Sequence, residues 1–290
     1  MAENQAAALL ALLAALLFGA GMQFTQLGLR SVDSQRGTML TIAASTLCYW
    51  LVAPWFLDWA WWGSSVVFLY LAIGLIRPFL SSNLSIAGTA ILGPTISSTL
   101  SATAPFFALL FGVLFLEEAL TLQTVAGTVA IVVGVVLLAR QRDSATDAAW
   151  PLWALALPIG AAVIRVTAHL SAKIGLEVIP SAYFVGLVSY SASLALALIN
   201  NTRHASSMME LTRRPDSLWF LLTGLLYGAA VFTLNVALQM GNLSVVGPIV
   251  SCEPIFVMLL GALFFRQRNL RRGVILCMFI VVLGVILITG

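Results

Sequence analysis

The chain contains two copies of one apolar pattern, and this duplication constrains its fold more than any other feature. PFFALLFGVLFLEE at Pro105–Glu118 returns as PIFVMLLGALFFRQ at Pro254–Gln267, an offset of 149 residues. VGVVLLA at Val133–Ala139 returns as LGVILIT at Leu283–Thr289, an offset of 150 residues. A nearly constant offset over most of the chain indicates that one half is a duplicate of the other.

The composition is typical of a membrane protein. Hydrophobic residues make up 61% of the sequence and charged residues only 9%, whereas soluble domains are about one-quarter charged. Apolar runs of about 20 residues, the length that a helix needs to cross a bilayer, follow one another closely. We predict ten spans, at residues 6–29, 37–57, 65–87, 93–115, 122–139, 150–172, 181–199, 217–239, 243–265 and 273–289.

The duplication matches spans one to five with spans six to ten. The third and fourth spans are divided at Gly88–Pro94, where glycine and proline interrupt the pattern, and the matching break is Gly241–Asn242. Because five is odd, the halves must be inverted relative to each other. We predict an all-α membrane protein of ten transmembrane helices, built as two inverted five-helix repeats around a central cavity. The repeats cover residues 1–139 and 150–290, and residues 140–149 link them.

Loop charge predicts the orientation, because lysine and arginine in short loops mark the cytoplasmic face. The loops on the side opposite the termini contain eleven arginines, whereas the loops on the side of the termini contain one basic residue, Lys173. Both termini are therefore expected on the non-cytoplasmic side. The eleven are Arg30, Arg36, Arg140, Arg142, Arg203, Arg213, Arg214, Arg266, Arg268, Arg271 and Arg272.

The sequence lacks the motifs of common enzymes and ATP-driven pumps. It contains no HExxH, GxSxG or GxxxxGK pattern. Its three cysteines, Cys48, Cys252 and Cys277, lie within predicted spans and have no paired spacing. We expect no disulfide, no bound metal, no cofactor and no nucleic-acid partner. A membrane-embedded enzyme stays an alternative that no motif supports.

The long stretch from Gly93 to Leu138 resembles a known group of transporters. GPTISSTLSATAPFFALLFGVLFLEEALTLQTVAGTVAIVVGVVLL, its second copy and the ten spans are similar to the EamA-type permeases of the drug/metabolite transporter (DMT) superfamily. The resemblance implies two inverted five-helix halves around a cavity and the export or exchange of small metabolites. We expect a multi-pass protein of the bacterial inner (plasma) membrane.

The chain departs from this family in two respects. The first span usually carries a Trp-Gly pair, which appears here as Phe18-Gly19. Members of this length usually keep their termini in the cytoplasm, opposite to the orientation that the loop charges predict.

Three ionisable residues fall near the middle of predicted spans: Arg77, Arg165 and Glu253. Each costs about 2.5–3.5 kcal/mol at a helix centre, so such residues normally face a cavity or one another. A static Arg–Glu pair that joins two helices is one interpretation. Two arginines against one carboxylate leave a positive charge, which favours a bound carboxylate or phosphate.

Two groups within predicted spans, His169 and Glu253, can carry protons. His169 lies four residues after Arg165 and thus on the same helix face; it is either a hydrogen-bonded filler or a proton carrier. Glu253 precedes Pro254 and replaces Ala104 of the first repeat. Burial favours its neutral form, which suits proton coupling, whereas pairing with an arginine would keep it charged.

Further polar residues within spans complete the predicted lining of the cavity: Asn83, Asn235, Gln23, Tyr227 and Ser101. The fifth and tenth spans are uniformly apolar and predict packing only.

Together, these residues predict a secondary transporter that moves a small anionic or zwitterionic organic solute by alternating access. The alternative within the same fold is a flippase for a lipid or a lipid-linked sugar. The partners are the solute, carrying a carboxylate or phosphate, and the lipid bilayer. The oligomeric state is a monomer or a homodimer.

Overall fold

The computed structural model describes residues 2–31, 34–140, 151–200, 217–264 and 272–289, and these residues are helical apart from short turns and loops. Seven helices of this part are long and apolar enough to cross a membrane, and three shorter apolar helices accompany them. The α-helices are α1 (Ala2–Gly28), α2 (Ser34–Phe56), α3 (Val66–Leu75), α4 (Ser81–Ser101), α5 (Ala104–Leu116), α6 (Leu122–Arg140), α7 (Ala156–Val178), α8 (Ala182–Asn200), α10 (Ser217–Met240), α11 (Leu243–Val250), α12 (Glu253–Phe264) and α13 (Arg272–Thr289).

Three short helical turns complete the described elements: η1 (Trp59–Gly63), η2 (Ile76–Leu80) and η3 (Leu152–Leu155). The predicted all-α membrane fold is confirmed. The predicted break at Gly241–Asn242 is also confirmed, because α10 ends at Met240 and α11 begins at Leu243.

The predicted division between the third and fourth spans is wrong. Helix α4 runs unbroken through Gly88–Pro94, and the chain breaks instead at Arg77 and at Ala102–Thr103. Both breaks lie next to a proline. Arg77 precedes Pro78, whose ring disfavours helical geometry in the preceding residue, and Arg77 is indeed extended, with φ −132° and ψ 132°. Pro105 lies at the first turn of α5, where a missing N–H costs nothing.

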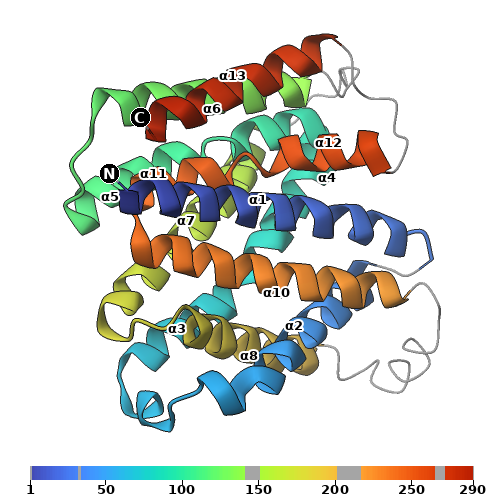
Figure 1. The fold of residues 1–290 in the computed structure, drawn as a ribbon. Helices are drawn as coiled ribbons and strands as arrows, with labels where there is room; N and C mark the ends of the chain where they lie inside the picture. The colour runs from blue at the N-terminus through green and yellow to red at the C-terminus, as the bar shows by residue number, and fades with distance from the viewer. Residues whose placement is uncertain (1, 32–33, 141–150, 201–216, 265–271, 290) are drawn as a thin grey trace.

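The helices form layers that place the two halves against each other (Figure 1). Helices α1 and α10 lie side by side across the middle, α6 pairs with α13 at one edge, and α3 packs against α8 toward the other. Each of these pairs joins one helix from each half.

Helices α6 and α13 carry the duplicated segment, yet they run antiparallel in Figure 1. Equivalent helices that point in opposite directions are what an inverted repeat requires. The pair packs closely through Gly127 and Gly284, because a Cβ atom on either glycine would collide with the backbone oxygen of the other.

Candidate solute-binding cavity

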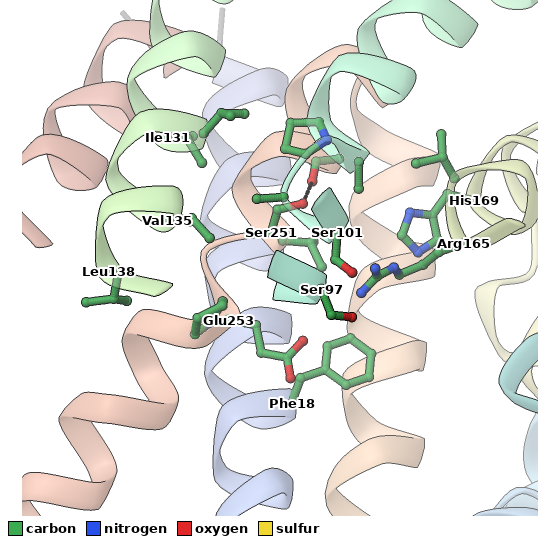
Figure 2. A pocket seen from close by; sticks show the side chains of 18 of the residues that line it. Phe18, Ser97, Ser101, Ile131, Val135, Leu138, Arg165, His169, Ser251 and Glu253 are labelled. Atoms are coloured by element: carbon green, nitrogen blue, oxygen red, sulfur yellow. Dashed lines mark hydrogen bonds between the residues drawn. The ribbon is translucent and has the colours of Figure 1, made fainter. Parts of the chain in front are cut away.

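A cavity of about 430 Å³ lies between helices of both halves. The first half contributes α1, η2, α4, α5 and α6, and the second contributes α7, α11 and α12. The lining residues are Phe18, Arg77, Ser97, Ser101, Ala102, Ala104, Pro105, Ile131, Val132, Val135, Leu138, Arg165, Val166, His169, Gly247, Val250, Ser251, Glu253 and Pro254. Figure 2 shows this pocket from close by.

The basic side of the cavity comes mainly from α7. Arg165 and His169 lie one helical turn apart, and Figure 2 shows them close together at the edge of the pocket. The Nε atom of Arg165 is buried and has no hydrogen-bond partner among the described residues. Buried donors without a partner are rare in proteins, so this group is ready to donate to an acceptor that enters the cavity.

The helix break places Arg77 in the same cavity. Because Pro78 has no N–H, the carbonyl of Gly74 lacks its usual helical donor. The hydroxyl of Ser193 on α8 donates to this carbonyl at 2.8 Å and contacts the carbonyl oxygen of Arg77 at 3.2 Å. Ser193 thus compensates for the break and holds the backbone that carries the arginine.

The Arg77 side chain contacts α7 and α1. Its Nη1 atom lies 3.0 Å from Nε2 of His169, and its guanidinium lies 5.9 Å from the ring centre of Phe18. A cation at this distance from an aromatic ring is attracted by the electrons of the ring face.

Glu253 supplies the negative charge of the cavity. It begins α12, directly after the turn at Ser251–Cys252, and a carboxylate in the first turn of a helix is stabilised by the exposed N–H groups there. The charges of Arg165 and Arg77 both act on it, and Figure 2 shows the Glu253 and Arg165 side chains in the same pocket. Among the described lining residues, two guanidinium groups therefore face one carboxylate.

Hydroxyl groups and apolar side chains line the rest of the cavity. Ser97, Ser101 and Ser251 contribute hydroxyls. The fifth span, predicted to serve packing only, also forms a wall as α6, through Ile131, Val132, Val135 and Leu138. The cavity can therefore hold a polar group and an apolar group at the same time.

Three of the other predicted site residues lie away from the cavity lining. The Gln23 amide donates to the carbonyl of Val257 and so joins α1 to α12. The Tyr227 ring packs on Phe18 of the lining, at 5.6 Å between ring centres. The Asn235 amide donates to the carbonyl of Ala182 at 3.4 Å. The side chain of Asn83, on α4, lies outside the described part of the structure.

Sequence reasoning missed a cluster at the end of the molecule where the termini lie. The carboxylate of Glu118 accepts hydrogen bonds from the backbone N–H groups of Leu243 and Ser244 at the start of α11. Nζ of Lys173 donates to the carbonyls of Leu238 and Gly241 at the end of α10. The sequence signal that could have indicated this cluster is an acidic residue three residues after the end of the predicted span at 93–115. In the part of the chain that the structure describes, no three His, Cys, Asp or Glu side chains gather as metal ligands would.

Comparison with known proteins agrees with this architecture. The EamA-like transporter family matches residues 5–140 and, a second time, residues 152–290. A solved crystal structure is similar over 98% of this chain and 96% of its own, with a TM-score of 0.76 and 17% sequence identity, which supports the fold alone. The search of curated proteins found no significant match. The chain therefore belongs to the EamA-like transporter family of the DMT superfamily, whose members are membrane transporters of small solutes and not enzymes.

Proposed function

We propose that this protein is a secondary active transporter that moves a small anionic or zwitterionic organic metabolite by alternating access. One observation carries the proposal: Arg77 and Arg165 line the same cavity as a single described carboxylate, that of Glu253. An uncompensated guanidinium in a membrane is costly, and a solute with a carboxylate or phosphate group would neutralise it.

The chemistry of the cavity supports such a solute. Guanidinium groups bind carboxylate and phosphate through paired hydrogen bonds, and the buried Nε of Arg165 has no partner among the described residues. Glu253 can accept a hydrogen bond from an ammonium group, which extends the range to zwitterions. A volume of about 430 Å³ is in the usual range for small-molecule sites.

The position of the cavity supports alternating access. Its walls come from both halves, so a rocking motion of one half against the other would expose it to each side of the membrane in turn. We propose residues 1–139 and 150–290 as the moving halves. From the arginine-rich loops we further propose that both termini lie on the non-cytoplasmic side of an inner membrane.

The test is uptake by proteoliposomes. Purified protein is first screened by thermal shift against amino acids, organic acids, sugar phosphates and nucleotides, and a stabilising compound is then used as the labelled solute. Arg165→Ala and Arg77→Ala each remove charge-assisted hydrogen bonds worth about 1.5–3 kcal/mol, so each should raise KM about 10- to 100-fold.

The matched control is Arg30→Ala, because Arg30 is exposed and lies away from the cavity. It should leave KM unchanged. Uptake that is unchanged in both cavity variants would remove the site assignment.

A further inference from the structure

The contact between Arg77 and His169 specifies the protonation of the imidazole. The two nitrogens lie 3.0 Å apart, and a guanidinium has only donors. Nε2 of His169 must therefore be the acceptor, without a proton of its own. The ring is then neutral and carries its proton on Nδ1, which is buried and has no hydrogen-bond partner among the described residues.

We propose that the hydrogen bond from Arg77 to His169 keeps the guanidinium of Arg77 from binding the anionic solute in the cavity until His169 is protonated. We call this pair of residues the proton-operated lock. A proton from solvent can occupy Nε2 only when the hydrogen bond from Arg77 breaks, because both would use the same lone pair. Protonation then leaves two cations in contact, so Arg77 turns its donors toward the solute. His169 is thus a positioning residue that acts through Arg77, and its role rests on the proposed function.

The charges around His169 make its protonation depend on whether an anion is bound in the cavity. His169 faces Arg77 from η2 and Arg165 one turn earlier on its own helix, and both oppose a further positive charge there. Glu253 from α12 is the described carboxylate of the same cavity. Tyr190 from α8 interacts with Arg77, and Lys173, one turn later on α7, is held by backbone carbonyls.

An anion between the two guanidinium groups would cancel much of this repulsion. Binding of the anion and protonation of His169 should therefore favour each other, so that one proton accompanies one anion.

The hydrogen bond can be tested without a solute. The chain has two histidines, so His204→Asn leaves one imidazole, whose tautomer is read by ¹⁵N NMR of histidine-labelled protein in micelles. We expect protonated Nδ1 and unprotonated Nε2. Arg77→Lys keeps a donor and should keep this tautomer, whereas Arg77→Met should allow a proton on Nε2. A proton on Nε2 in the parent, or the same tautomer in Arg77→Met, would overturn the lock.

The coupling is tested with sodium acetate and inorganic phosphate as probe anions. At saturating anion, the pH at which half of His169 is protonated should rise, because the anion stabilises the charged ring. Arg165→Ala should reduce this rise. If a bound anion leaves the midpoint in place, the coupling is wrong although anion transport can stand. If the tautomer is as expected but no anionic solute is transported, the proposed function fails while the hydrogen bond stands.

Variants of His169 separate the lock from a purely structural role. In His169→Gln the amide oxygen can hold Arg77 at every pH, whereas His169→Ala releases it at every pH. Acetate binding should lose its pH dependence in both variants, and it should be weaker in His169→Gln than in His169→Ala. Equal weakening in both variants, with the parent's pH profile retained, would overturn the proposal.

Discussion

The carboxylate of Glu118 accepts a hydrogen bond from the backbone N–H of Ser244 at 2.8 Å, across the boundary between the two repeats. The same carboxylate accepts from the N–H of Leu243 at 2.6 Å. Helix α11 therefore takes its cap from the first repeat, and the negative charge complements the positive end of the helix dipole. Because α11 lines the cavity through Gly247 and Val250, this cap helps to set the position of one cavity wall.

Loss of this cap should destabilise the protein. Glu118→Ala leaves two N–H groups at the buried start of α11 without their acceptor, which should lower the free energy of unfolding by about 1.5–3 kcal/mol. Denaturant titration in mixed micelles measures it. The control is Glu117→Gln at the exposed neighbour, which should behave as the parent does. Equal stability of the two variants would contradict the cap.

Lys173 should stabilise the turn between α10 and α11, at the end of which Glu118 caps α11. Its ammonium group caps the carbonyl end of α10, so Lys173→Met should cost about 1 kcal/mol or more. Lys173→Arg retains donors and should cost less. Because Glu118 and Lys173 attract each other and both bond to the backbone around the turn between α10 and α11, the double variant Glu118→Ala/Lys173→Met should show a coupling energy of about 0.5 kcal/mol or more. Strictly additive losses would mean that the two caps act independently.

The α6–α13 contact should tolerate no side chain at its glycines. A Cβ atom on Gly127 would lie 2.5 Å from the backbone oxygen of Gly284, and overpacking of this kind costs about 1–3 kcal/mol. Gly127→Ala should therefore lower the melting temperature in detergent. Gly63→Ala is the control, because no atom lies within 4 Å of the added carbon. A Gly127→Ala protein as stable as this control would show that the helices are not so close.

Ser193 should contribute more to the stability of the protein than Ser189, which lies one helical turn earlier on α8. Ser193→Ala removes the donor that satisfies the carbonyl freed by Pro78, at a cost of about 1 kcal/mol or more. Ser189 donates only within its own helix, to Val185 and Gly186, so Ser189→Ala should cost less. The measurement is the melting temperature of each variant in thermal unfolding. A lower melting temperature for Ser189→Ala than for Ser193→Ala would exclude the proposed role of Ser193 at the break.

Helix breaks illustrate the limits of local rules. Reading Gly88, Gly93 and Pro94 as a boundary placed the division of the third and fourth spans wrongly, because interhelical packing can keep such residues in a helix. The steric effect of a proline on the preceding residue is a bias and not a rule: it breaks the helix at Arg77-Pro78, whereas α2 and α11 continue through Pro54 and Pro248.

The sequence by itself determined the apolar helices, their duplication, the odd number of spans per half and the ionisable residues that a membrane tolerates only in special places. These properties follow from hydropathy and periodicity, which are local. Only the tertiary structure decided which of these residues meet: Arg77 with His169 in one cavity, and Glu118 with α11 more than a hundred residues further along the chain. Gln23 and Asn235, equally polar in sequence, join helices instead. The physical reason is that a buried polar group bonds to whatever acceptor or donor distant helices bring within about 3 Å, and that distance depends on the packing of the whole bundle.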